Sequence, residues 1–240
     1  MKKFNIFLCA ISFLLVIACN TFAGWELYDD FDSGSSFETD KWSLDTSSAN
    51  ISIENGEAKF VHLPGRPNDS SWLILVKNPK NIVGIRAKVR VESYVGDVRG
   101  RIAGYVGKIG ENSIWSAVRV RPSRGRAETY ASILAPNDVY LNDLFFGTFK
   151  YNYGQPANIL NKNYIIEWYF SAADIAAKTD DQGEIIFEYE DPVSPSESTF
   201  KGLGTRSTEM DGACTLYFDD VYVYRKRPSP ATNLLLLGNS

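Results

Sequence analysis

Cysteine and histidine are almost missing from this 240-residue chain, which has three cysteines and one histidine, His62. A single histidine excludes a multi-histidine metal site within one chain. Cys9 and Cys19 lie in an apolar N-terminal stretch, so its removal would leave Cys214 as the one protein thiol and would exclude an intrachain disulfide. We therefore expect a fold held by its apolar core or by a cation, with Cys214 as a small packing residue.

Long apolar runs are also missing, apart from residues 4–18, which follow Lys2 and Lys3. A basic start and a short apolar run are typical of a secretory signal, and this run is shorter than the ~20 residues of a spanning helix. We predict a signal peptide over residues 1–23, with cleavage after Ala23. Residues 16–19 also resemble a bacterial lipobox, which would make Cys19 a lipid anchor and the one attachment to a membrane. Both alternatives predict export to the periplasm, the cell surface or the medium.

The chain has little positive charge. Without residues 1–23 it has 23 basic and 29 acidic residues, a net charge of −6. This balance excludes a general nucleic-acid binder. The remaining 217 residues suffice for one domain with a well-buried core. We expect residues 24–226 to form that domain, as a monomer.

No part of the mature chain has the pattern of a long helix. Residues 82–95 alternate strictly, with Ile85, Val89 and Val91 on one face and Arg86 and Arg90 on the other, as in a strand with one buried face. Similar segments predict strands at 49–54, 57–63, 71–77, 100–108, 114–121, 127–134, 138–149, 163–170, 184–190 and 214–224. Asn55-Gly56 predicts a hairpin turn. We expect a short helical turn at 171–178 and a long surface loop at 191–212.

The two ends of the domain carry a family resemblance. The start reads Trp25-Glu26-Leu27-Tyr28-Asp29-Asp30-Phe31-Asp32, and the end reads Tyr217-Phe218-Asp219-Asp220-Val221-Tyr222-Val223-Tyr224. Both resemble the first and last strands of concanavalin A-like domains of the laminarinase and LamG types. The resemblance implies an all-β fold, an antiparallel two-sheet jelly-roll β-sandwich in which the first and last strands lie together.

The same resemblance raises the question of an enzyme. Laminarinase-type hydrolases carry Glu-x-Asp-x-Glu on a central strand, and a retaining mechanism needs two carboxylates about 5–5.5 Å apart. Residues 99–134, where that strand belongs, contain only Glu111 and Glu128. The nearest set is Glu184, Glu188 and Glu190, which has Ile186 in the place of the aspartate. The motif is absent, and we expect no catalytic residues.

The resemblance also implies a structural calcium ion. In this family an aspartate of the last strand binds Ca²⁺ together with oxygens of the first strand and of an early hairpin. Asp219 takes the place of that aspartate, Asp30 that of the acidic residue in the opening motif, and Gly56 that of the hairpin glycine. Calcium binds about 6–8 oxygens, so waters would complete this set. The alternative is that Asp219 accepts backbone N–H groups and binds no metal.

A basic segment stands out from the acidic background. Residues 86–126 contain ten basic residues and three acidic ones. Arginine forks bind carboxylate or sulfate, and aromatic rings stack on sugars. The candidate ligand-binding residues are Trp115, Arg101, Arg119 and Tyr130. The alternative is that these arginines only make an outer sheet face soluble.

These observations lead to an exported, non-catalytic, lectin-like domain that binds a polysaccharide, with an acidic glycan as one option. Two alternatives stay open: a structural or surface-matrix protein without a small ligand, and a divergent glycan-cleaving enzyme. Residues 227–240 form a tail that resembles a partial PEP-CTERM sorting signal, with a disordered apolar stub as the alternative.

Overall fold

The computed structural model describes residues 24–105, 113–134, 149–170, 175–180, 185–189 and 201–225. Residues Trp25–Arg225 form one compact unit. The described secondary structure consists of strands and three short 3₁₀-helices. The all-β class predicted from the alternation of the sequence is therefore confirmed. No helix among the described residues has the length and apolar character needed to cross a membrane.

The strands fall into two groups by sheet. The first sheet contains β1 (Trp25–Asp29), β3 (Ala49–Glu54), β4 (Glu57–His62), β6 (Ile82–Val95), β11 (Asn163–Phe170), β12 (Ile175–Asp180), β13 (Ile185–Tyr189) and β15 (Ala213–Arg225). The second sheet contains β2 (Trp42–Asp45), β5 (Ser70–Leu75), β7 (Val98–Tyr105), β8 (Ser113–Arg121), β9 (Arg126–Leu134), β10 (Phe149–Asn152) and β14 (Gly202–Ser207). The 3₁₀-helices are η1 (Pro79–Asn81), η2 (Pro122–Arg124) and η4 (Pro156–Ile159).

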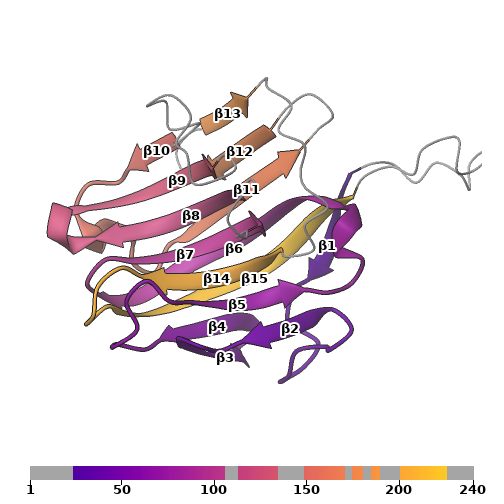
Figure 1. Ribbon diagram of the computed structural model, residues 1–240, viewed down its shortest axis with the longest axis horizontal. Helices are drawn as coiled ribbons and strands as arrows, with labels where there is room; N and C mark the ends of the chain where they lie inside the picture. Colours follow the sequence, from indigo (N-terminus) through magenta and orange to yellow (C-terminus); the bar gives the residue numbers. More distant parts are fainter. Residues whose placement is uncertain are drawn as a thin grey trace, which may run out of the picture. The chain divides into compact units, whose positions relative to one another are not determined.

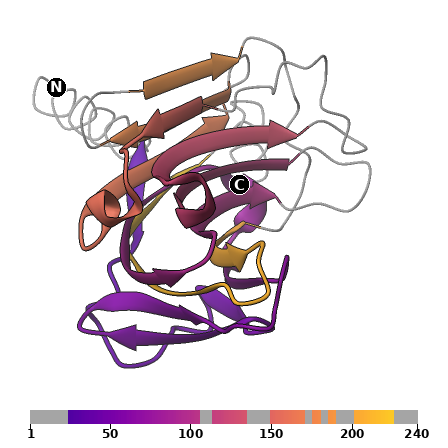
Figure 2. The same cartoon turned by 90° about the vertical axis from the view of Figure 1, so that its left-hand side faces the viewer.

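The two sheets pack as the layers of an antiparallel sandwich (Figure 1, Figure 2). The strand order is β13-β12-β11-β6-β15-β4-β3 in the first sheet, with β1 paired to β15. The second sheet has the order β10-β9-β8-β7-β14-β5-β2. Strands distant in sequence, such as β6 and β15, are therefore neighbours, and the predicted jelly-roll sandwich is confirmed.

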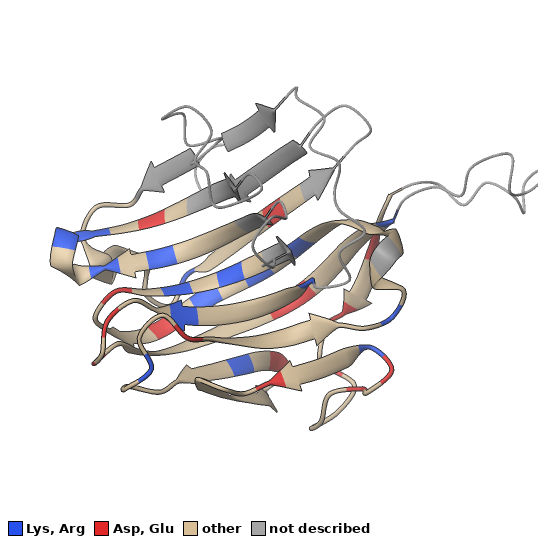
Figure 3. Ribbon diagram, viewed as in Figure 1, with Lys and Arg blue, Asp and Glu red and all other residues tan. Residues whose placement is uncertain are grey.

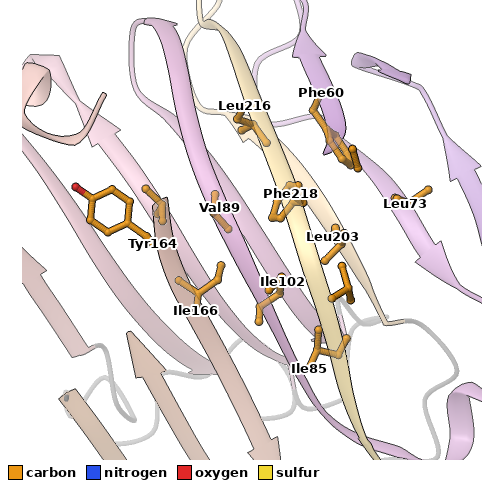
Figure 4. Close-up of a cluster of buried hydrophobic side chains, with 14 of the residues drawn as sticks. Phe60, Leu73, Ile85, Val89, Ile102, Tyr164, Ile166, Leu203, Leu216 and Phe218 are labelled. Atoms are coloured by element: carbon orange, nitrogen blue, oxygen red, sulfur yellow. The ribbon is translucent and has the colours of Figure 1, made fainter. Parts of the chain in front are cut away.

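The core lies between the inner faces of the two sheets. Val89, Phe218 and Ile166 come from the first sheet, and Ile102 and Leu203 from the second; all five are fully buried. Figure 4 shows these side chains converging in the interior. The alternation predicted for residues 82–95 is present in β6, since Ile85, Ala87, Val89 and Val91 are buried and the basic side chains between them are partly exposed. Burial of apolar area at about 25 cal/mol per Å² is the main source of stability here.

The ends of the domain lie side by side, as the family resemblance implied. Trp25 pairs with Tyr224 and Asp29 with Val221 in antiparallel register. The rings of Trp25 and Tyr224 make an edge-to-face contact at 5.6 Å between centroids. Because β15 pairs with β4, β6 and β1, the first sheet is complete only when the last strand of the domain is in place.

Two predictions of local structure were wrong. Residues 202–207, expected within a loop, form the central strand β14 between β5 and β7. A Cβ on Gly202 would lie 2.7 Å from the carbonyl oxygen of Leu73, so glycine is needed for this close approach and hides the strand in the sequence. Residues 175–178, expected within a helical turn, belong to β12, because pairing with β11 and β13 overrides the helix propensity of alanine. Of the predicted strand at 138–149, residues 138–148 lie outside the described residues.

Candidate functional site

The basic residues of the 86–126 segment divide between the two outer faces of the sandwich. Arg86, Lys88 and Arg90 lie on the outer side of β6 in the first sheet, opposite the buried residues of that strand. The chain then crosses to the second sheet, where β7, β8 and β9 carry the arginines that follow. Figure 3 shows the basic positions recurring along neighbouring strands. Lys108 lies outside the described residues, and Arg124 is exposed in η2.

Acidic side chains and aromatic rings contact the cations of the first sheet. The Arg86 guanidinium lies 4.9 Å from the Trp25 ring centroid and 4.6 Å from that of Tyr222. Arg90 stacks on Tyr217 at 3.9 Å and forms an ion pair with Glu57. Lys88 forms ion pairs with Asp219 and Asp220. Each of these three cations thus has an acidic or aromatic partner within its own sheet.

The second sheet presents a different face. Six arginines alternate with buried residues along its strands and therefore point outward; we call this set the arginine face: Arg99, Arg101, Arg119, Arg121, Arg126 and Arg206. In the ladder, Arg206 pairs with Arg99, and Arg99 pairs with Arg119. Like charges directly opposite each other destabilise a sheet. A row of three arginines across three strands is therefore an arrangement that stability alone does not favour.

Two carboxylates partly neutralise this face. Glu128, which is 1% exposed, accepts from Arg119 Nε at 2.6 Å through Oε1, and its Oε2 lies 3.2 Å from Arg126 Nε. Asp97 lies 3.1 Å from Arg121 Nε and accepts from the Ser123 hydroxyl at 2.9 Å. Within residues 96–105 and 113–134, five arginines of this face stand beside two carboxylates, so positive side chains outnumber negative ones in this part of the sheet. Such an excess attracts anions from solution.

Arg101, a predicted ligand contact, forms part of a layered cluster. Its guanidinium lies 4.3 Å from the centroid of the Trp72 ring and its Nη2 donates to the Ser70 hydroxyl. A Cβ on Gly204 would meet the Trp72 ring, so glycine lets the indole lie across β14 toward β7. Arg101 is 2% exposed and Trp72 is 4% exposed. Arg101 would therefore reach a ligand only if its surroundings moved. The sequence alone did not indicate Trp72, because only the pairing of β5 with β14 brings it here.

Arg119 is the predicted residue best placed for a ligand. It lies in the row of arginines, is partly exposed, and is oriented by the buried Glu128. Trp115 occupies the β8 position that pairs with Ala103 and Ser132, and Tyr130 the β9 position that pairs with Ala117 and Lys150. The side chains of Trp115 and Tyr130 lie outside the described residues. The register places all four predicted positions on three adjacent strands.

The three predicted calcium ligands come from neighbouring stretches of the first sheet. Phe218 pairs with Ala58, which places Asp219 beside the β3–β4 hairpin and Gly56, and Asp29 pairs with Val221. A Cβ on Gly56 would meet the Asp32 carboxylate, so Asp32, which the sequence analysis did not select, covers the turn. Both turn residues have positive φ, 54° for Asn55 and 77° for Gly56, as a type I′ hairpin requires.

Asp219 contacts a backbone N–H group and a lysine ammonium. Its Oδ1 accepts the backbone N–H of Asp220 at 2.7 Å, and its Oδ2 lies 3.5 Å from Lys88 Nζ. Burial raises the pKa of Asp219, and the nearby Asp220 carboxylate acts in the same direction. Within the described residues, no three His, Cys, Asp or Glu side chains are grouped so that they could hold a metal. A calcium ion would thus rely on Asp219, on Asp30 or Asp32, and on backbone oxygens such as that of Gly56, and it would displace the Lys88 ammonium.

Few carboxylates lie near the arginines of β7, β8 and β9. Within residues 96–105 and 113–134, Asp97 and Glu128 are the only carboxylates, and each contacts an arginine. Outward positions 117, 119 and 121 of β8 are alanine, arginine and arginine. Glu184 and Glu190, the alternative carboxylates, lie outside the described residues, as does the side chain of Glu188 in β13. Glu111 also lies outside the described residues.

Comparison with known proteins supports the fold. No family model and no curated protein sequence matches the chain. Among solved structures, the chain is similar to the apo Crh5 transglycosylase, with a TM-score of 0.57, 12% identity, and coverage of 86% of this chain and 87% of that one. It is also similar to the laminarinase from Rhodothermus marinus, with a TM-score of 0.55, 13% identity, and coverage of 85% and 99%. A third similar structure is SCLam, a non-specific endo-β-1,3(4)-glucanase from family GH16, with a TM-score of 0.51, 10% identity, and coverage of 85% and 92%. These likenesses establish a concanavalin A-like sandwich.

Proposed function

We propose that this protein is an exported, non-catalytic carbohydrate-binding domain that binds an acidic glycan on the arginine face. The observation that carries the proposal is the row of Arg206, Arg99 and Arg119 across β14, β7 and β8. Natural sheets avoid opposed like charges, and departures from such local rules are expected where a binding function compensates for them. A polyanion laid across the three strands would bring negative charge close to all three arginines and would offset their mutual repulsion.

Two further observations support a carbohydrate as the ligand. The sandwich has the fold of proteins that act on glucans and other glycans, such as the Rhodothermus marinus laminarinase. Fold alone does not determine function, so the chemistry of the face has to carry the argument. The absence of paired carboxylates in residues 96–105 and 113–134 favours binding over hydrolysis.

The test is binding of the purified protein to a panel of neutral, uronic-acid and sulfated polysaccharides at low and high salt. We expect acidic polysaccharides to raise the melting temperature, because a ligand that binds only the folded state stabilises it. The effect should weaken with salt, since screening acts strongly on exposed charges. Arg99→Gln should reduce the shift, whereas Arg90→Gln, on the outer face of the first sheet, should leave it unchanged.

Binding of neutral glycans alone, or equal effects of the two variants, would contradict an acidic-glycan site on the arginine face. Release of reducing ends from any polysaccharide would contradict the non-catalytic proposal and favour the divergent enzyme. The absence of any polysaccharide effect would favour the structural-protein alternative.

A further inference from the structure

The hairpin formed by β8, η2 and β9 contains four arginines within residues 119–126. We call Arg119, Arg121, Arg124 and Arg126 the arginine hairpin. Arg121 and Arg126 are directly opposite each other in the ladder, next to the turn. Like charges at such a pair repel, because side chains of opposed residues begin only about 4.5–5.5 Å apart. The stability of the hairpin alone therefore does not favour arginine at both positions.

Carboxylates orient the guanidiniums from the strand side. Arg121 Nε donates to Asp97 Oδ2 at 3.1 Å, whereas Arg126 Nε lies 3.2 Å from Glu128 Oε2 in an ion pair without a hydrogen bond. Asp97 is 8% exposed and Glu128 is 1% exposed, so both acids lie beneath the surface formed by the arginines. A guanidinium has five N–H donors in a fixed fork, and the Nε contact leaves the four donors of the two Nη atoms. Arg121 is thus oriented by a hydrogen bond and Arg126 by an ion pair, and the Nη donors of both can serve a ligand.

The charges of the hairpin do not balance. Asp97 and Glu128 contact three of the four guanidiniums, and Glu128 divides its two oxygens between Arg119 and Arg126. The remaining positive charge lies at one end of the arginine face, around a turn whose Arg124 is exposed. Glu128 serves two arginines and Asp97 serves one, so an external anion would be a further partner for the hairpin's guanidiniums.

The geometry distinguishes between kinds of anion. A carboxylate presents two oxygens in one plane and matches a single guanidinium fork. Two forks that come from opposed strands are better matched by a tetrahedral group, whose oxygens point in several directions. We propose that the arginine hairpin recognises a tetrahedral oxyanion, a sulfate ester of the polysaccharide, through Arg121 and Arg126. This inference rests on the proposed glycan-binding function. The rest of the arginine face then follows the chain of the glycan.

The experiment compares three polysaccharides with one backbone: dextran, carboxymethyl dextran and dextran sulfate, the last two at matched charge density. We expect the purified protein to bind dextran sulfate at least tenfold more tightly than carboxymethyl dextran. The double variant Arg121→Lys with Arg126→Lys keeps the charge but loses the planar forks. It should lose this preference and keep the weaker binding common to both polyanions.

Two controls separate the sources of failure. Arg86→Lys with Arg90→Lys makes the same change on the other sheet and should leave the preference intact. Thermal melts should show that the hairpin variant is folded, since it removes no contact from the core. Inorganic sulfate and phosphate, added separately, should compete with dextran sulfate in the wild type and to a smaller extent in the hairpin variant.

Each outcome separates this inference from the proposed function. Equal binding of dextran sulfate and carboxymethyl dextran, or a preference that persists in the lysine variant, would overturn the sulfate site and leave an acidic-glycan domain. Stabilisation by inorganic sulfate that the lysine variant loses, without binding of any polysaccharide, would overturn the glycan function and keep the oxyanion site.

Discussion

His62 is the side chain through which pH should act most directly on the fold. It is 1% exposed on the inner side of β4, and among the described residues neither ring nitrogen has a hydrogen-bond partner. Burial lowers its pKa below the usual 6.5, although the Asp69 carboxylate acts in the opposite direction. The folded state therefore favours the neutral ring, and the unfolded state takes up the proton first as the pH falls.

The expected result is a stability that is complete above about pH 6.5 and falls as the pH drops through that value, by at most about 1.4 kcal/mol per pH unit from this residue. His62→Leu should remove this part of the pH dependence. Urea unfolding of both proteins at pH 7.5 and 5.5 measures it as the difference between the two curves. If His62→Leu and the wild type lose the same stability between pH 7.5 and pH 5.5, His62 does not titrate in this range.

Glu128 should be the carboxylate on which the arginine face depends most. It is almost fully buried between Arg119 and Arg126, and loss of one partner from a buried ion pair typically costs about 3–5 kcal/mol. Glu128→Gln should therefore lower the free energy of unfolding by an amount of this order. Glu54→Gln, which breaks an exposed pair with Lys59, should lower the stability far less, because solvent screens an exposed ion pair. Chemical denaturation of the two variants compares them, and equal losses would argue that the Glu128 cluster is as loosely held as a surface pair.

Among the elements, β14 is the one whose glycines decide its place in the sheet. A Cβ on Gly204 would lie 2.7 Å from the carbonyl oxygen of Ser71 and would also meet the Trp72 ring. Gly204→Ala should destabilise the protein by roughly 1–3 kcal/mol through this overpacking. Gly34→Ala is the matched control, because its Cβ would meet nothing nearer than 3.9 Å. Thermal melting compares the two, and a Gly204→Ala protein as stable as the control would mean that Trp72 moves aside at little cost.

The same strand explains why prediction from the sequence succeeded in some elements and failed in others. β6 alternates apolar and charged residues because one of its faces is in the core and the other in water, so its bounds and faces were predicted correctly. β14 is covered on both sides and contains two glycines, which carry no alternation. The excess of arginines was visible in the sequence. Its division between two faces, and the approach of Trp72 to Arg101, depend on strand pairing that no local pattern encodes.

At the scale of the whole molecule, the closure of the first sheet joins the two ends of the domain at one corner. The register brings Asp219 beside the turn at Gly56, and the Asp32 carboxylate covers that turn. Burial and the neighbouring Asp220 carboxylate raise the pKa of Asp219, and a cation bound at this corner would offset both effects. Lys88 supplies one positive charge there, but an ammonium cannot bridge the carboxylates and the hairpin carbonyl as a calcium ion with 6–8 oxygen ligands would.

We therefore expect calcium to raise the melting temperature, by roughly 2–4 °C for each kcal/mol of binding free energy in a domain of this size. Asp219→Asn should abolish the shift, whereas Asp211→Asn, at an exposed loop position before β15, should keep it. Differential scanning calorimetry in EDTA and at several calcium concentrations makes the measurement. If neither EDTA nor calcium changes the melting temperature of the wild type, the Lys88 ion pairs with Asp219 and Asp220 take the place of the metal. In that case Lys88→Met should destabilise the closure, because the two carboxylates would then lie together without a counter-charge.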